Sequence, residues 1–93
     1  MSSQLLSLYI AGRTAAAERA LRNLKEIISP LAVDGRRLEI EVIDILEHPQ
    51  LAEDDRILAT PVVIKKRPPP VRRVVGDLSE HDKVLIGLDL KGL

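Results

Sequence analysis

The chain has 93 residues, of which 45% are hydrophobic and 30% charged, and its 14 basic residues balance its 14 acidic ones. This length suits a single domain over residues 1–93, and the zero net charge argues against a nucleic-acid or membrane partner. The absence of cysteine excludes disulfides, thiol redox chemistry and thiolate metal sites. No run approaches the roughly 18 apolar residues of a membrane span, and the N-terminus lacks the basic segment of a signal peptide, so we expect a cytoplasmic location.

The N-terminal half has the pattern of a strand, a helix and a second strand. Leu5 to Ile10 form an apolar run that predicts a buried strand, and Thr14 suits the N-cap of the next element. We expect Pro30 to end that helix, whose apolar residues recur at helical spacing: Ala17, Ala20, Leu21, Leu24, Ile27, Ile28 and Leu31. Residues 38–43 alternate apolar and acidic and then end in an apolar residue, which predicts a half-buried strand. The two strands are therefore expected to be parallel, with a right-handed crossover.

The C-terminal half begins with a short predicted helix and continues into a hairpin. Pro49 suits the first helical position, with Glu53, Asp54 and Asp55 expected early in the helix and Leu51, Ala52 and Leu58 on its inward side. Pro61 ends this element. Residues 62–66 and 72–75 then predict a hairpin with Pro68, Pro69 and Pro70 at its turn. Ser79-x-x-Asp82 resembles a capping box for a last helix, with Val84, Leu85 and Leu88 facing the core.

The resulting order, β-α-β-α-β-β-α, is typical of a thioredoxin-like α/β domain with a mixed sheet. In that fold the proline before the third strand is commonly cis, and Thr60-Pro61 occupies this place. The last segment also fits a strand, because Ile86, Leu88 and Leu90 alternate with small or polar residues. As a helix it would carry Gly87 in its interior at ~1 kcal/mol and Asp89 near the negative end of the dipole. Local preferences thus leave helix and strand nearly balanced.

Few residues suit catalysis or metal binding. The dithiol of a redox thioredoxin would stand at residues 11–14, which contain no thiol. His48 and His81 lack metal-ligating neighbours at suitable spacing, which favours surface histidines at helix caps. The run Glu53-Asp54-Asp55 fits a metal or general-acid site, but acid enrichment at a helix start is the favoured interpretation. We therefore assign no catalytic, cofactor-binding or metal-binding residue.

The predicted hairpin carries a basic cluster made of Lys65, Lys66, Arg67, Arg72 and Arg73. A nucleic-acid site would need a larger positive excess and stacking aromatic residues. A protein-docking patch and a plain solvated hairpin are both left open. The prolines favour docking, because they order the loop in advance and reduce the entropy lost on binding.

A series of sequence blocks in order resembles the KaiB family from about Leu6 to Leu90. The blocks are Leu8-Tyr9-Ile10-Ala11-Gly12, Ile43-Asp44-Ile45-Leu46, Pro49 to Asp55, Ile57-Leu58-Ala59-Thr60-Pro61, Pro68 to Arg73, Gly76-Asp77-Leu78-Ser79 and Val84 to Leu90. This resemblance implies two alternative folds that share the N-terminal β-α-β unit. One is a tetrameric ground form of order β-α-β-β-α-α-β, and the other is a fold-switched, thioredoxin-like monomer that binds partners. The basic run Lys65-Lys66-Arg67 disfavours tight tetramer packing, so we expect the thioredoxin-like form here.

The resemblance also implies a function. KaiB-like proteins are non-enzymatic clock or timing regulators that bind a KaiC-type ATPase and change its phosphorylation, with a KaiA-type protein or a sensor histidine kinase as further partners. Candidate partner-binding residues are Pro49, Gln50, Asp54, Arg56, Lys66, Arg67 and Arg73. Candidate switch residues are Pro61, Pro68, Pro69, Pro70, Gly87 and Asp89, and helix propensity predicts that Gly87→Ala with Asp89→Arg favours the thioredoxin-like form. An alternative is a thioredoxin-like sensor or adaptor domain related to the input domain of the clock histidine kinase, in a stress or non-rhythmic signalling system.

Overall fold

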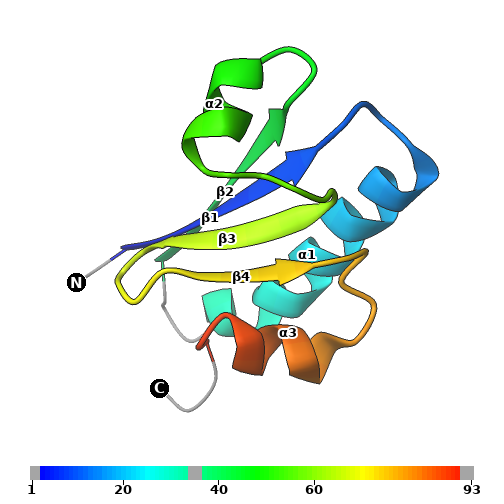
Figure 1. Cartoon of the computed structure of the whole chain (residues 1–93). Helices are drawn as coiled ribbons and strands as arrows, with labels where there is room; N and C mark the ends of the chain where they lie inside the picture. Colours follow the sequence, from blue (N-terminus) through cyan, green and yellow to red (C-terminus); the bar gives the residue numbers. More distant parts are fainter. Residues whose placement is uncertain (1–2, 34–36, 91–93) are drawn as a thin grey trace.

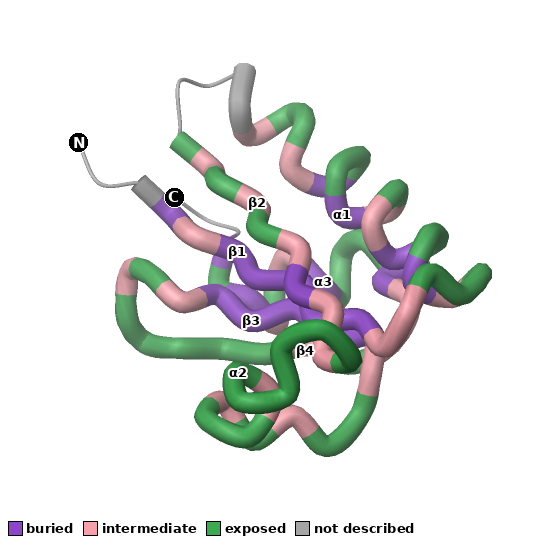
Figure 2. The backbone as a smooth tube through the Cα atoms, turned by 90° about the horizontal axis from the view of Figure 1, so that it is seen from above, coloured by how far each residue is buried: buried purple, intermediate pink, exposed green. Residues whose placement is uncertain are grey.

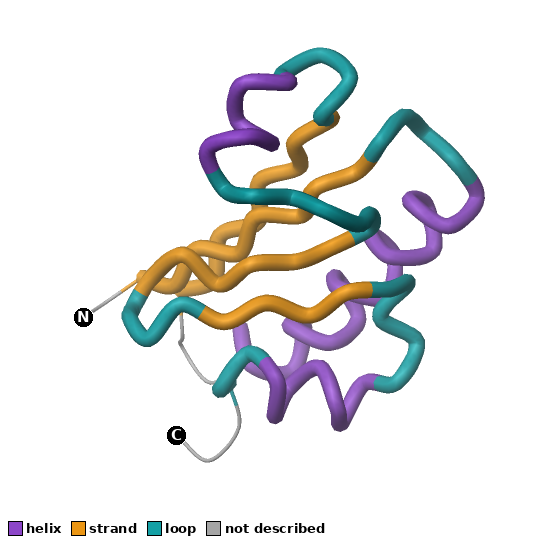
Figure 3. The backbone as a smooth tube through the Cα atoms, viewed as in Figure 1, coloured by secondary structure: helices purple, strands orange, loops and turns teal. Residues whose placement is uncertain are grey.

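The computed structural model describes residues 3–33 and 37–90 of the chain. Its elements follow the predicted order and form a four-stranded mixed sheet with the strand order β2-β1-β3-β4 (Figures 1 and 3). Strands β1 and β2 are parallel, while β3 is antiparallel to both β1 and β4. The thioredoxin-like prediction is therefore confirmed. The elements are β1 (Ser3–Ile10), α1 (Ala15–Val33), β2 (Arg37–Asp44), α2 (Pro49–Asp54), β3 (Val62–Arg67), β4 (Arg72–Val75) and α3 (His81–Gly87).

Helices α1 and α3 cover one face of the sheet, and α2 lies over the other (Figures 1 and 2). Because side chains alternate along a strand, Leu6, Leu8 and Ile10 of β1 point into the main core under α1 and α3. Tyr9 belongs instead to a smaller core on the α2 side, together with Ile43, Val62 and Ile64. The sheet is thus buried on both faces, as its purple central strands show in Figure 2.

The first helix forms as predicted at its start but continues past its predicted end. The backbone N–H of Ala17 donates to Oγ1 of Thr14 at 3.1 Å, which confirms the N-cap. Pro30 lies inside α1, so the prediction that it ends the helix was wrong. A proline removes only its own backbone donor, and Pro30 is exposed in the last turn. The next residue, Leu31, packs against the core and holds that turn in place.

Helix α2 differs most from its prediction. Pro49 begins it as expected, but the helix has only six residues, so Glu53 and Asp54 lie at its C-terminal end rather than in its first turn. The dipole explanation for the acidic run was therefore wrong. Leu51 is 40% exposed and Leu58 is 96% exposed, so these two side chains do not face inward as predicted. The apolar contact of this segment with the sheet is made by Ile57 instead.

The hairpin and the last helix resolve the ambiguous C-terminal segment. The peptide bonds before Pro61, Pro68 and Pro70 are cis, and the three consecutive prolines form the β3–β4 turn. Residues 81–87 are helical, and Val84, Leu85 and Leu88 pack into the core as predicted. The predicted capping box is wrong, because Glu80 is the N-cap of α3 and makes no side-chain capping hydrogen bond.

Helix α3 ends in a Schellman motif with Asp89 in the left-handed conformation, at φ 57°. The N–H of Leu90 donates to the carbonyl of Leu85 at 2.8 Å, and that of Asp89 donates to Ile86 at 3.0 Å. Asp89 therefore lies beyond the helix end, at the position that glycine most often occupies.

Gly87 is the last helical residue and lies against β4. A Cβ added there would lie 2.8 Å from Cγ2 of Val74, which is closer than ordinary side-chain contacts allow. The glycine therefore permits a close approach of α3 to β4, and its helix-propensity cost is not its main effect.

Candidate protein-docking surface

The end of α2 is tied to the sheet through a single carboxylate. Asp55, the C-cap of α2, accepts a hydrogen bond from the Tyr9 hydroxyl and an ion pair from Nζ of Lys66 at 2.6 Å. The Lys66 ammonium also lies 5.5 Å from the centroid of the Tyr9 ring, within the range of a cation–π contact. Tyr9 comes from the central strand β1 and Lys66 from β3, so Asp55 joins three elements.

Arg73 of β4 completes this arrangement from the outer strand. Its guanidinium donates to the backbone carbonyl of Asp55 at 3.0 Å and to that of Arg56 at 3.3 Å. The last carbonyls of a helix have no N–H donor within the helix itself, and Arg73 supplies donors for these two. Arg56 adopts φ 52°, and the N–H of Ile57 donates to the carbonyl of Ala52 at 2.9 Å, as in a Schellman motif. We call Tyr9, Asp55, Lys66 and Arg73 the Asp55 network.

Proton affinities in the Asp55 network follow from its burial and pairing. Burial raises the pKa of the Asp55 carboxyl, but hydrogen bonds from Lys66 and Tyr9 lower it by more, so the pKa lies below its ordinary value of 3.8. Burial lowers the pKa of Lys66, but the hydrogen bond to the Asp55 carboxylate raises it by more. The pKa therefore lies above its ordinary value of 10.5. Burial and the hydrogen bond to Asp55 both raise the pKa of Tyr9 above 10.0. At neutral pH the network therefore holds one carboxylate, one ammonium and a neutral phenol.

All candidate partner-binding residues except Arg67 lie on or next to α2. Pro49, Gln50, Asp54 and Arg56 are exposed on α2 and the turn after it, where Nε2 of Gln50 donates to Oδ1 of Asp54 at 2.9 Å. Lys66 and Arg73 reach the base of this helix through the Asp55 network. Arg67 lies apart from them, with its guanidinium 3.7 Å from the carboxylate of Glu39 on β2. We call the exposed part the α2 surface: Pro49, Gln50, Leu51, Asp54, Arg56 and Leu58.

Sequence reasoning missed the residues that hold and complete this surface. Tyr9 and Asp55 were not assigned roles, although Tyr9 is the only aromatic residue of the chain and Asp55 was noticed within the acidic run. Leu51 and Leu58 were expected to be buried. Their exposure has no signal in the sequence, because it depends on how α2 is anchored.

The candidate switch residues are spread over the C-terminal half of the fold. Pro61 is buried at the start of β3, the three consecutive prolines form the hairpin turn, and Gly87 and Asp89 lie at the end of α3. They do not form one site. Their assigned role in switching stays a prediction.

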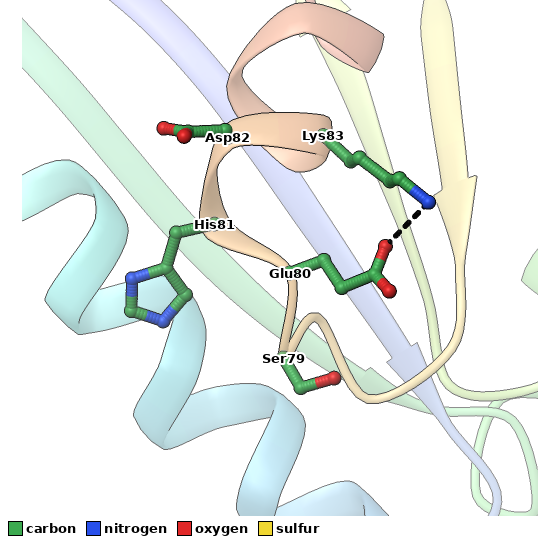
Figure 4. Close-up of a pocket in the computed structure, with 5 residues that line it drawn as sticks. All are labelled: Ser79, Glu80, His81, Asp82 and Lys83. Atoms are coloured by element: carbon green, nitrogen blue, oxygen red, sulfur yellow. Dashed lines mark ion pairs between the residues drawn. The ribbon is translucent and has the colours of Figure 1, made fainter.

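The histidines do not belong to a metal-binding cluster. Figure 4 shows the hollow at the start of α3, where Nζ of Lys83 pairs with Oε2 of Glu80 at 2.8 Å and the imidazole of His81 points away from that pair. His48 lines a small hollow with Arg13, Asp44 and Glu47. Within residues 3–33 and 37–90, no three His, Cys, Asp or Glu side chains are grouped so that they could hold a metal ion.

The loop where a redox protein would carry its dithiol is held by a carboxylate instead. Oδ1 of Asp44 accepts hydrogen bonds from the N–H of Gly12 at 3.1 Å and from that of Leu46 at 3.0 Å. Gly12 adopts φ 78°, a conformation that glycine tolerates without strain.

Fold and site together define a thioredoxin-like domain without thiol chemistry. In the described part of the chain, no helix is long and apolar enough to cross a membrane.

Comparisons with solved structures agree with a thioredoxin-like fold. The N-terminal domain of SasA from Synechococcus elongatus superposes with a TM-score of 0.78 at 21% identity, covering 100% of this chain and 90% of that one. Mitochondrial thioredoxin 3 of Saccharomyces cerevisiae gives a TM-score of 0.72 at 14% identity, covering 94% and 77%. These likenesses concern the fold alone.

The sequence comparisons identify the family. Residues 7–90 match the KaiB domain. The circadian clock oscillator protein KaiB of Picosynechococcus sp. is 54% identical over 87 residues, covering 92% of this chain and 81% of that protein. The KaiB of Trichodesmium erythraeum is 55% identical over 86 residues, covering 92% and 81%. This chain belongs to the KaiB family.

Proposed function

We propose that this chain is a non-enzymatic timing regulator that binds a KaiC-type ATPase through the α2 surface and thereby changes its phosphorylation. The observation that carries the proposal is the exposure of Leu58, at 96%, on a segment that is nevertheless held firmly to the sheet. Its place of action would be the cytoplasm. A KaiA-type protein or a sensor histidine kinase would be a further partner, sequestered or displaced once the ATPase is bound.

The composition of the α2 surface supports protein docking. Leu51 and Leu58 are exposed at 40% and 96%, and the preceding Leu46 is exposed at 70%. Apolar side chains beside charged ones, here Asp54 and Arg56, are typical of the centre and rim of a protein interface.

The anchoring of α2 supports the proposal in a second way. A six-residue helix is too short to be stable by itself. The Asp55 network fixes its end to three strands, so the surface is ordered before a partner arrives, which reduces the entropy lost on binding.

Switching between two folds is part of the proposal. The thioredoxin-like form would be the binding form, and the tetrameric ground form would store inactive protein. The two forms need differ by only a few kcal/mol for exchange to occur. Pro61, Pro68, Pro69, Pro70, Gly87 and Asp89 are the proposed positions at which that balance is set.

Binding to a purified hexameric KaiC-type ATPase tests the proposal, with complexes measured by native mass spectrometry and the phosphorylation state followed over time. Leu58→Asp is expected to weaken binding by about tenfold or more, because it places a charge where an apolar contact forms. Ile86→Asp is the matched control, since Ile86 is 64% exposed on α3. Absence of binding by the unmodified chain, or equal binding by both variants, would contradict the proposal. Binding to an isolated histidine kinase but not to the ATPase ring would favour the sensor or adaptor function instead.

A further inference from the structure

Strand β4 leaves one edge of the sheet open. It is the outermost strand on its side, and among the described residues it pairs with β3 alone. The N–H of Gly76 donates to the carbonyl of Pro61 at 2.9 Å, which sets the alternation of hydrogen-bonded pairs along these two strands. By that alternation Val74 and Arg72 bond to β3, whereas Arg73 and Val75 turn their backbone N–H and C=O groups outward. The edge therefore offers donors and acceptors to an added strand.

Two cations lie side by side next to this edge. Lys65 of β3 is directly opposite Arg72 of β4, and Lys65 is only 2% exposed whereas Arg72 is exposed. In the described ranges, no acidic side chain forms an ion pair with either residue. Like charges directly opposite each other destabilise a sheet. A carboxylate placed beside them would relieve this repulsion.

A charged edge can also serve only to prevent aggregation. That explanation accounts for Arg72 and Arg73 but not for Lys65, which lies on an inner strand and is buried. It also fails to account for Val71 and Val75 at this edge, which are 57% and 59% exposed. The edge combines open backbone groups, apolar side chains and unneutralised positive charge.

We propose that β4 binds an extended acidic segment of another protein by strand addition, with a carboxylate of that segment reaching Arg72 and Lys65. This interaction goes beyond the proposed binding through the α2 surface and uses another part of the molecule. The best-fitting segment has two adjacent acidic residues opposite Arg72 and Arg73 and two β-branched residues opposite Val74 and Val75. A second copy of this chain fits poorly, because its own β4 would bring more arginine to the same place.

A synthetic peptide Thr-Val-Val-Glu-Glu-Thr, capped at both ends, tests the proposal against a peptide with lysine in place of glutamate. Amide hydrogen exchange of the whole chain is measured by NMR with each peptide. The acidic peptide is expected to slow exchange at Arg73 and Val75, the outward-facing amides, more than at Arg72 and Val74. The lysine peptide is expected to have no such effect.

Two charge reversals make the test specific. Arg72→Glu is expected to weaken binding of the acidic peptide by about tenfold or more and to create binding of the lysine peptide. Arg22→Glu, the same charge change at an exposed position of α1, is expected to leave both affinities unchanged.

Several results would overturn the proposal. Equal effects of the two reversals would mean general charge attraction. Sodium acetate reproducing the exchange pattern would mean simple anion binding. A dimeric mass in light scattering, with Arg73 and Val75 protected in the absence of peptide, would make a second copy the occupant of the edge. None of these results depends on an ATPase, so they leave the proposed function untouched.

Discussion

Replacing Asp55 by asparagine is expected to weaken the attachment of α2 to the sheet, while the side chain at position 55 keeps its size. The variant keeps an oxygen that can accept the hydrogen bond from Tyr9 but loses the charge that pairs with Lys66. Lys66 then keeps a partly buried ammonium without its anion. Both variants of the pair, Asp55→Asn and Lys66→Met, should therefore lower the free energy of unfolding, and together they form a double-mutant cycle.

The size of the effect follows from the burial of the pair. The side chains of Lys66 and Asp55 are 26% and 28% exposed, with 2.6 Å between nitrogen and oxygen. Exposed pairs contribute up to about 1 kcal/mol, and breaking a buried one costs roughly 3–5 kcal/mol, so a loss of about 2 kcal/mol is expected. For a domain of this size, such a loss lowers Tm by roughly 8–16 °C. Urea unfolding followed by circular dichroism measures the free energies directly.

The pH dependence of this difference has a definite sign. The pKa of Asp55 is lowered in the folded state, so its contribution is complete above the unfolded value of 3.8 and is lost as pH falls through the lower folded pKa. The pKa values of Lys66 and Tyr9 are raised, so their contributions are complete below 10.5 and 10.0 and are lost as pH rises through the folded values. The gap between the unmodified chain and Asp55→Asn should therefore stay constant near neutral pH and close in acid.

Lys83→Met is the control for general loss of a surface ion pair. Lys83 pairs with Glu80 at 2.8 Å, but both side chains are largely exposed, so no measurable change in stability is expected. If Asp55→Asn behaved like this control, or if the cycle gave no coupling between Asp55 and Lys66, the role assigned to the network would be refuted.

Three further substitutions test the helix ends, each by urea unfolding. Gly87→Ala is expected not to stabilise the thioredoxin-like form by itself, because the new Cβ would lie 2.8 Å from Cγ2 of Val74. In a Val74→Ala background, the same substitution should raise the free energy of unfolding by up to ~1 kcal/mol. A rise in the unmodified background would show that the Val74 side chain moves aside easily. Asp89→Gly should raise the free energy of unfolding by about 0.5–1 kcal/mol, since φ there is 57°, and a loss would mean that the aspartate side chain stabilises the turn. Thr14→Ala should lower stability by about 1 kcal/mol through loss of the hydrogen bond to Ala17, and an unchanged value would refute the capping role.

The prediction of Leu58 as an inward residue shows where sequence reasoning stopped. Helical periodicity assumes that a helix lies flat on the core, so apolar residues on one side were assigned to the interior. Helix α2 ends at Asp54, so Leu58 lies beyond it, on a segment that polar contacts hold and to which helical periodicity does not apply. Six residues contain too few turns for the pattern to decide orientation.

Gly87 and Asp89 show a different limit. Propensity treats each residue as part of an isolated helix and therefore assigned both an unfavourable role. In the structure, Gly87 allows contact with Val74 of another element, and Asp89 ends the helix in a left-handed conformation. The effect of each residue depends on what lies across from it, which propensity does not include.

The sequence by itself determined the order of the elements, because strand alternation, helical periodicity and capping act over a few neighbouring residues, and its ordered sequence blocks indicated the family. Thr14 at the start of α1 and Pro49 at the start of α2 were assigned correctly on that basis. Only the tertiary structure decided what Asp55 and Lys65 contact. The Tyr9–Asp55 hydrogen bond spans 46 positions of the chain, and Lys65 meets Arg72 through the register of the hairpin. Such contacts depend on the packing of whole elements, and no local pattern encodes them.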